Sequence, residues 1–438
     1  MNSLLERASA AAKIASTCEL RGQVRDVTGL IIEGSGPLIP VGSHVTVHSG
    51  VLKIPAQVVG FRTDRVLLMP YAEPQGISPG ALITSDGTHG MVTVSDRLLG
   101  RVINAMGEPL DGAPLAVGGE PVPLYRSPPN PITRTRIQEC FDTGVRAINS
   151  MLTVGVGQRV GIMAGSGVGK STLLGMIAKH ASSDINVIAL VGERGREVRE
   201  FIERDLGEEG LKRSVVVCAT GNESALLRIR AALLATAIAE HYRDCGKRVV
   251  LMVDSVTRFC MAQREIGLAV GEPPSTRGYT PSVFSVLPKL LERAGNGEGV
   301  GSITGLYTVL VDGDDMNEPI ADATRGILDG HIVLSRKLAS KGHFPAIEVL
   351  DSISRVMSDI TPPEVQETAR QAREIIATYR ETEDLISIGA YKAGQNPRVD
   401  RAVQLIDAVN KHLKQLPGDK TDLVSSMKLL NQLISQGK

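Results

Sequence analysis

The chain has 438 residues, of which 42% are hydrophobic and 22% charged, and its 48 basic residues are balanced by 48 acidic ones. This length predicts two or three domains, because one compact core does not organise so long a chain. The zero formal charge, and aromatic residues at only 3% with no Trp, argue against a protein that holds nucleic acid by charge and base stacking. Five cysteines without a CxxC pair, and the lack of any apolar run approaching membrane-spanning length, favour a soluble cytoplasmic protein.

The first two segments differ in pattern. Residues 1–19 are Ala-rich and predict a short helical segment with Leu4, Leu5, Ala8 and Ala12 on one face. Residues 20–92 predict a small β-barrel, because short β-type runs alternate with turns rich in Gly and Pro. The expected strands of this barrel cover residues 22–27, 30–33, 44–47, 57–61 and 66–69.

The next segment, residues 93–356, predicts an α/β domain. Continuous runs of Val, Ile and Leu alternate with helical periods, and such runs are typical of parallel strands that are buried on both faces. The expected strands cover residues 159–163, 186–191, 214–219, 248–253 and 302–311. Residues 357–438 contain no strand-like run, and helical periodicity over 364–380 and 398–414 predicts a helical domain there.

A glycine-rich loop follows the first of these strands and precedes a helical segment that includes Thr172. A strand, a glycine loop and a helix N-terminus together form the context of a phosphate-binding loop. Ala stands at the first position, where the strict motif has Gly, and we interpret it as a tolerated small replacement. A chance glycine-rich turn is the weaker alternative. The loop consists of Ala164, Gly165, Ser166, Gly167, Val168, Gly169, Lys170 and Ser171.

The residues of this loop have distinct expected roles. The glycines let backbone N–H groups converge on phosphate oxygens, and the helix dipole adds favourable charge. Lys170 is expected to reach the outer phosphates of a nucleoside triphosphate, and the Ser171 hydroxyl to hold Mg²⁺. The sequence therefore predicts a P-loop ATPase with Mg²⁺ as the ion that accompanies ATP.

Carboxylates follow two of the predicted strands. Asp254 ends the strand that covers residues 248–253, where it can hold the Mg²⁺ shell or, alternatively, cap the next helix. Glu193 follows the strand 186–191 and is placed to polarise a water molecule as general base. Glu197 competes for that role, since the charges from Arg194 onward also fit a solvated helix surface.

Several long strings beyond these motifs occur together in one order. They are VGERGREVREFI at 191–202, LMVDSVTRFCMAQ at 251–263, GEPPSTRGYTPSVFSVLPKLLERAG at 271–295, GDDMNEPIADATRGILDGHIVLSR at 313–336 and SISRVM at 352–357. With them the chain resembles the catalytic ATPases of type III protein export, which are relatives of the catalytic subunit of rotary F-type ATP synthases. The resemblance covers about residues 20–401 and implies a RecA-like P-loop core between an N-terminal β-barrel and a C-terminal helical domain.

The resemblance also implies roles for single residues. Glu193 matches the catalytic glutamate, with Arg194 beside it among the nucleotide-binding residues, and Asp254 matches the aspartate on the Mg²⁺ side. Arg355 matches an arginine finger that acts in the neighbouring subunit. Two further residues concern the adenine: Phe344 stands where the family usually has a stacking Tyr, and Tyr391 is the candidate for the other face of the base.

The implied assembly is a homohexamer, because one chain carries both halves of the site, with Lys170 and Glu193 in one half and Arg355 in the other. The implied partners are a stator-like regulator, a central stalk protein, the membrane proteins of the export gate and chaperone–cargo complexes, with no nucleic acid among them. The implied location is the cytoplasm, at the inner-membrane export gate. The string GDDMNEPI at 313–320 favours flagellar export.

Three other functions compete with this interpretation. One is the ATPase of a virulence-type secretion system, the injectisome. A second is a ring-shaped helicase on RNA or DNA, which shares the P-loop core but needs basic and aromatic residues in its N-terminal domain, where residues 20–92 offer only Phe61 and Tyr71. The third is a ring subunit without catalysis, and the intact Lys170, Glu193 and Asp254 oppose it.

Overall fold

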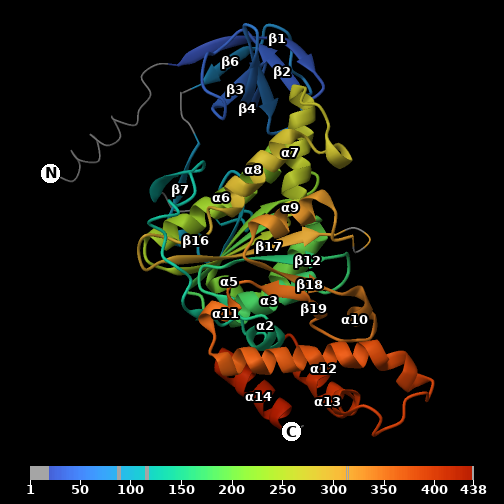
Figure 1. The fold of residues 1–438 in the computed structure, drawn as a ribbon. Helices are drawn as coiled ribbons and strands as arrows, with labels where there is room; N and C mark the ends of the chain where they lie inside the picture. Colours follow the sequence, from blue (N-terminus) through green and yellow to red (C-terminus); the bar gives the residue numbers. More distant parts are fainter. Residues whose placement is uncertain (1–18, 86–89, 114–117, 312, 314, 437–438) are drawn as a thin grey trace, which may run out of the picture.

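The computed structural model describes residues 19–85, 90–113, 118–311, 313 and 315–436. The chain forms three parts that follow one another along the long axis of the molecule (Figure 1). A β-barrel lies at one end, an α/β layer structure in the middle and a group of helices at the other end, as the sequence predicted. The predicted helical segment in residues 1–19, with Leu4, Leu5, Ala8 and Ala12, lies outside the described residues except for Glu19.

The barrel closes in the strand order β1-β2-β5-β4-β3-β6. Its interior is filled by alternate side chains of the strands, such as Val45 and Val47, because successive residues of a strand point to opposite faces. All five predicted strands are present, and the strand that the sequence did not predict, β6, closes the barrel by pairing with β1 and β3. The strands are β1 (Leu20–Thr28), β2 (Ile31–Gly34), β3 (His44–Ser49), β4 (Leu52–Arg62), β5 (Arg65–Pro70) and β6 (Leu82–Ser85).

A connection leads from the barrel to the central sheet. Strand β7 (Met91–Val94) pairs with β9 (Glu120–Pro123) in a small separate sheet, so the predicted boundary between residues 92 and 93 falls inside a strand. Between these two strands, β8 (Arg101–Asn104) joins the edge of the central sheet beside β14 (Ser214–Ala219). The connection therefore contributes a strand to the α/β domain.

The central sheet has the order β19-β18-β12-β17-β15-β13-β14-β8, and β16 pairs with β17. Its pairings are parallel except for β18–β19 and β16–β17. The five predicted strands are confirmed, and they are joined by β8 and by the β18–β19 edge. The remaining strands are β12 (Arg159–Ala164), β13 (Ile185–Val191), β15 (Arg248–Asp254), β16 (Gly295–Asn296), β17 (Ser302–Leu310), β18 (Gly330–Leu334) and β19 (Ile347–Ser354).

Helices cover both faces of this sheet (Figure 1). Strand β12 shows why: Val160 and Ile162 belong to one buried cluster and Met163 to the other, because neighbouring side chains alternate between the faces. One face packs against α2 (Arg146–Met151) and α3 (Lys170–His180). The other packs against α6 (Ala225–Asp244), α7 (Val256–Val270), α8 (Pro281–Leu291) and α9 (Pro319–Ile327).

The C-terminal part is helical. Helix α12 (Pro363–Ser387) and helix α13 (Pro397–Leu413) contain the two predicted helices, and α14 (Leu423–Ser435) completes the group. Buried residues of all three helices continue the cluster that covers the α3 face of the sheet. Of the described helices, none has the length and apolar character to cross a membrane.

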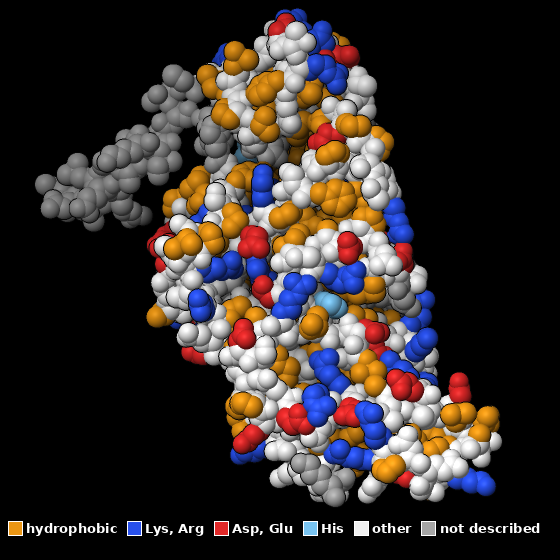
Figure 2. Space-filling view, viewed as in Figure 1, with side chains coloured by type: hydrophobic (Ala, Val, Ile, Leu, Met, Phe, Trp, Pro, Cys, Tyr) orange, Lys and Arg blue, Asp and Glu red, His pale blue; other side chains and the backbone are white. Residues whose placement is uncertain are grey.

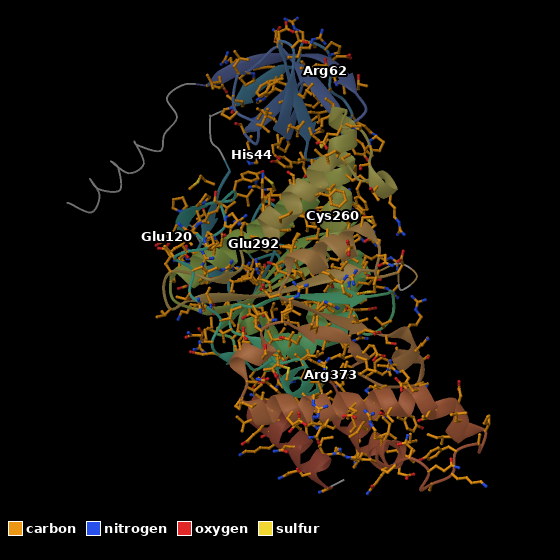
Figure 3. All side chains as sticks on the ribbon, viewed as in Figure 1. His44, Arg62, Glu120, Cys260, Glu292 and Arg373 are labelled. Atoms are coloured by element: carbon orange, nitrogen blue, oxygen red, sulfur yellow. The ribbon has the colours of Figure 1, made fainter. Side chains whose placement is uncertain are left out.

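Polar contacts join the three parts, and Figure 3 labels one residue of each junction, His44 and Arg373. At the base of the barrel, the His44 ring lies 3.1 Å from the Arg230 guanidinium of α6, next to an apolar cluster that includes Ile31 and Ile266. At the other end, Arg373 of α12 donates to the backbone carbonyl oxygen of Met151 at 2.8 Å. Each junction thus bonds an arginine, buried in the case of Arg230 and partly buried in the case of Arg373, to a residue of the neighbouring part.

Candidate active site

The phosphate loop connects β12 to α3, as the sequence predicted. Gly167 and Gly169 have φ angles of 77° and 90°, in the left-handed region that favours glycine. Gly169 is the residue before the first helical residue, Lys170, so the loop ends at a helix N-terminus. Ser171 and Thr172 follow in the first turn of α3. The backbone thus has the geometry that a phosphate group requires.

Three ionisable side chains meet at this loop. Lys170 Nζ lies 2.5 Å from Asp254 Oδ1 and 3.5 Å from Glu193 Oε1. They meet because β12, β15 and β13 are parallel strands of one sheet, and residues that follow parallel strands gather at the same edge. The structure therefore brings the predicted lysine and both predicted carboxylates together.

The electrostatics of this group are set by burial. The Asp254 side chain is only 4% exposed and those of Lys170 and Glu193 are largely buried. Burial and the nearby charge of Asp254 raise the pKa of Glu193 to about 7, although Lys170 opposes this shift. Burial lowers the pKa of Lys170, but the charges of Asp254 and Glu193 outweigh it, so the net shift is upward.

Glu193 is available for chemistry. Its Oε1 atom is buried and accepts no hydrogen bond within the described part of the chain, although Lys170 lies near it. A carboxylate with a pKa near neutrality and an unused lone pair is suited to accept a proton as general base. Glu197, the competing candidate, lies in α4 (Gly195–Glu200) and contacts Arg194 at 3.3 Å. Arg194 itself is 80% exposed, at the rim of the site.

Arg355 is not part of this group. It follows the last residue of β19, where Ser354 pairs with Gly330 at the start of β18. The other end of β18, Leu334, is in register with Ala164 at the start of the phosphate loop. Arg355 and the loop therefore lie at opposite ends of β18. The strand's four residue steps, at about 3.3 Å each, put about 13 Å between them. Arg355 is exposed, and its guanidinium donates to the Arg325 carbonyl oxygen at 3.0 Å.

Phe344 lies beside the phosphate loop. A Cβ atom built on Gly169 would be 3.5 Å from Phe344 Cδ1. The Gln415 backbone N–H donates to the Phe344 carbonyl oxygen at 2.9 Å, so the segment after α13 is bonded to the Phe344 backbone. Leu416, which follows Gln415, is 70% exposed. An exposed apolar residue therefore follows directly after the residue that is bonded to the Phe344 backbone.

Tyr391 has its contacts elsewhere. Its hydroxyl oxygen lies 2.9 Å from the Asp400 carboxylate and 3.0 Å from the Asn396 carbonyl oxygen, two acceptors in the connection between α12 and α13 and the first turn of α13. None of these contacts involves the phosphate loop or Phe344. A role for Tyr391 against the adenine therefore stays a prediction.

One polar residue of this site was not predicted from the sequence. Thr308 of β17 donates its hydroxyl hydrogen to Asp254 Oδ1 at 2.7 Å. The signal was a threonine inside a run of Val, Ile and Leu, where a buried hydroxyl needs a partner.

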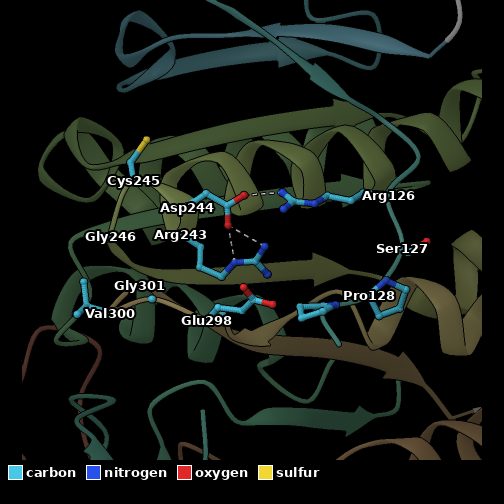
Figure 4. A pocket seen from close by; sticks show the side chains of 13 residues that line it. Arg126, Ser127, Pro128, Arg243, Asp244, Cys245, Gly246, Glu298, Val300 and Gly301 are labelled. Atoms are coloured by element: carbon cyan, nitrogen blue, oxygen red, sulfur yellow. Dashed lines mark hydrogen bonds and ion pairs between the residues drawn. The ribbon is translucent and has the colours of Figure 1, made fainter. Parts of the chain in front are cut away.

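Two cavities are lined by residues other than Lys170, Glu193 and Asp254. One of about 740 Å³ starts at Ala164 and Gly165 and extends along β18 to Arg380 of α12. Another, of about 550 Å³, lies at the opposite edge of the sheet, where Asp244 bridges Arg126 and Arg243 (Figure 4). Its charges are paired, so it offers no free cation for a phosphate. Basic and acidic side chains are interspersed on the face seen in Figure 2.

Comparison with known proteins identifies the family. Residues 144–354 match the nucleotide-binding domain of the ATP synthase alpha/beta family, and residues 361–432 match the C-terminal domain of the type III secretion ATPase EscN. The flagellum-specific ATP synthase of Bacillus subtilis is 57% identical over 94% of both chains. The type 3 secretion system ATPase of Xanthomonas euvesicatoria is 47% identical over 94% of this chain and 93% of that one.

A solved structure agrees. The assembled ATPase EscN of the enteropathogenic E. coli type III secretion system superposes with a TM-score of 0.89 at 44% identity, covering 94% of this chain and 100% of that one. The similarity spans all three parts of the fold. The chain belongs to the family of flagellum-specific ATP synthases and type III secretion ATPases, and it is a P-loop enzyme that hydrolyses ATP.

Proposed function

We propose that this ATPase works as a homohexameric ring in the cytoplasm, at the inner-membrane export gate, and hydrolyses ATP to energise the export of flagellar proteins. One observation supports the ring. Arg355 lies at one end of the sheet's strands, and the group of Lys170, Glu193 and Asp254 lies at the other end. A chain with two half-sites that cannot meet within itself needs a neighbour, and repeated head-to-tail contacts close into a ring.

The residues fit a magnesium ion that arrives with ATP. The Asp254 carboxylate and the Ser171 hydroxyl are hard oxygen donors, which Mg²⁺ prefers. In the described residues no group of three His, Cys, Asp or Glu side chains could hold a metal alone, so substrate phosphates and water would supply the other ligands. When bound, the ion would neutralise charge on the outer phosphates.

The proposed hydrolysis assigns a step to each residue. Lys170 binds the outer phosphates, and Glu193 orients a water molecule and accepts its proton as the water oxygen bonds to the γ-phosphorus. The bond between that phosphorus and the ADP oxygen breaks in the same displacement. Arg355 of the neighbouring copy balances the charge that develops, an effect worth about 10³–10⁵ in rate in related enzymes.

Phe344 supports nucleotide binding in this proposal, since its ring lies beside Gly169 and presents a flat face for the adenine. Arg194 and Thr172 complete the binding residues at the rim and the first turn of α3. For the second face of the base we favour Leu416 over Tyr391, because Leu416 follows Gln415, which is bonded to the Phe344 backbone, whereas the Tyr391 hydroxyl is bonded to Asp400.

The proposed partners follow from the relatives. One solved structure contains EscN in complex with its central stalk EscO, and that EscN is 43% identical to this chain. We extend this to a stalk protein here, together with a stator-like regulator, the export gate and chaperone–cargo complexes. No nucleic acid is among the proposed partners, and stimulation of hydrolysis by RNA or DNA would contradict that.

Measuring the specific rate of ATP hydrolysis over a range of protein concentrations tests whether the ring is required. If Arg355 acts in the neighbouring site, specific activity should rise sigmoidally as copies assemble. Sedimentation at the same concentrations identifies the species present. Constant specific activity down to dilutions that contain only monomer would refute the proposal.

The virulence-type secretion ATPase is the second candidate, because a relative with that name is 47% identical. Flagellar relatives reach 57% and 52% identity, in Bacillus subtilis and Caulobacter vibrioides, which favours the flagellar branch. Expression of this chain in a Bacillus subtilis strain that lacks its own enzyme distinguishes the two. Restored motility supports flagellar export, and active but non-motile cells would favour the alternative.

A further inference from the structure

The strand between the phosphate loop and the Asp254 strand contains a buried polar residue. Strand β17 lies between β12 and β15, in register with both: Thr308 is opposite Ile162, and Tyr307 is opposite Val253. Thr308 is completely buried, so its hydroxyl group needs a partner within the protein. Its position one residue beyond the Tyr307–Val253 pair puts it beside Asp254.

That partner is the Asp254 carboxylate. Thr308 Oγ1 lies 2.7 Å from Asp254 Oδ1 and 3.3 Å from the Val253 carbonyl oxygen. The hydroxyl has a single hydrogen, and the shorter distance and the negative charge both favour the carboxylate as its acceptor. The hydrogen bond therefore fixes the orientation of the Asp254 side chain.

The same oxygen receives a second donor, Lys170 Nζ, at 2.5 Å. The two donors respond differently when a nucleotide binds. A P-loop lysine turns to the outer phosphates when a triphosphate binds, whereas a hydroxyl buried in the central sheet stays in place. Once Lys170 has turned away, Thr308 remains as the donor on Oδ1, and Oδ2 carries no bond to either residue.

We propose that Thr308 is a positioning residue, which holds Asp254 through Oδ1 so that the carboxylate meets Mg²⁺ when the nucleotide brings it. This inference rests on the proposed metal role of Asp254. Partners that orient a metal-binding carboxylate typically affect metal affinity by about 10–100-fold. Thr308 therefore contributes to the gain in nucleotide affinity that Mg²⁺ provides, and not to nucleotide binding itself.

The test measures binding rather than turnover. The Kd of a fluorescent ADP analogue is measured for the full chain with Mg²⁺ and with EDTA. Thr308→Val keeps the shape of the side chain and removes the hydroxyl group. We expect its Kd in EDTA to stay within about twofold of wild type, and the gain on adding Mg²⁺ to fall by about 10-fold or more. Thr308→Ser keeps the hydroxyl and should restore most of the gain.

Thr304→Val is the matched control. Thr304 is a buried residue of the same strand and the same face, four positions earlier, and its Oγ1 accepts a hydrogen bond from Gly157 N–H at 3.0 Å. The Thr304→Val variant loses a buried hydroxyl that does not contact Asp254. Its gain in nucleotide affinity on adding Mg²⁺ should therefore equal that of wild type. An equal loss in both valine variants would assign the effect to the strand and overturn the proposal.

Other outcomes are equally decisive. A Thr308→Val protein with the full Mg²⁺ gain, or with equal losses in Mg²⁺ and in EDTA, would overturn the positioning role. The wild-type measurement separates this inference from the function on which it rests. A wild-type chain that binds the analogue equally well with and without Mg²⁺ would refute the metal role of Asp254 itself.

Discussion

Lys170 Nζ forms a 2.5 Å contact with Asp254 Oδ1, so the lysine that is expected to bind phosphate is paired with the carboxylate that is expected to face the metal. Both side chains are largely buried, and the pair neutralises charge that would otherwise be costly in the sheet edge. A triphosphate can replace Asp254 as the anionic partner of Lys170. Nucleotide binding then releases Asp254 from Lys170, because the lysine exchanges one anionic partner for the other.

Replacement of Lys170 by Ala should abolish this exchange. The phosphates lose their cation, and Asp254 and Glu193 are left as two buried carboxylates without a counter-charge. We expect the rate of phosphate release to fall by at least about 100-fold. Lys179→Ala is the control, because Lys179 lies in the same helix and its ammonium group donates to the Arg204 carbonyl oxygen, away from Asp254 and Glu193. A Lys170→Ala protein close to wild-type rate would contradict the assignment.

The pH dependence of hydrolysis should report Glu193. Its pKa is raised to about 7, chiefly by burial and then by the charge of Asp254. A general base must be deprotonated, so kcat/KM should be maximal above pH 7 and should fall as the pH drops through about 7. Glu193→Gln should reduce hydrolysis to background at all pH values and still bind the fluorescent ADP analogue.

Glu197 provides the matched variant for this profile. Its carboxylate contributes to the raised pKa of Glu193 by hydrogen bonding and by charge. Glu197→Gln removes that charge, so the pKa of Glu193 should fall and the acid limb of the profile should move to lower pH. A profile that does not move, or a Glu197→Gln protein as inactive as Glu193→Gln, would reopen the choice of base.

Arg355 should act across the interface between copies. Arg355→Ala and Glu193→Gln should each be inactive alone, because each lacks one half of every site. A mixed ring should regain activity where an intact Arg355 meets an intact Glu193, at about a quarter of the interfaces in an equal random mixture. Phosphate release after mixing and reassembly measures this recovery.

Arg370→Ala is the control for a general loss of surface charge. Arg370 is an exposed arginine of α12 that pairs with Glu367, and its loss should leave hydrolysis unchanged. Mixing that gives no recovery, while both variants still assemble, would show that Arg355 serves its own chain only.

Much of this site could be predicted from the sequence, because its residues follow strands whose pattern is unmistakable. Lys170, Glu193 and Asp254 come after continuous runs of Val, Ile and Leu. Once such runs are parallel neighbours, the residues that follow them must share an edge. The order of the strands determines which residues meet. The long sequence strings shared with the family assign the role of catalytic glutamate to Glu193 rather than to Glu197.

The rest depends on contacts between distant segments. Thr308 is one of several polar residues of its strand, and only the register of β15 and β17 gives its hydroxyl a partner. Strand β6 has four residues and becomes a strand through pairing with β1 and β3. The segment after α13 reaches Phe344 through a backbone hydrogen bond from Gln415, which has no sequence pattern.

The adenine site yields the last prediction. Phe344→Ala removes the ring beside Gly169 and should raise the KM for ATP by about 10-fold, since stacking of a base on an aromatic ring is worth about 1–3 kcal/mol. Phe344→Tyr keeps the ring and should behave as wild type. Leu416→Ala should weaken ATP binding and Tyr391→Ala should not, because Gln415 contacts Phe344 whereas the Tyr391 hydroxyl is bonded to Asp400. The reverse result would place Tyr391 against the base, as the family resemblance implied.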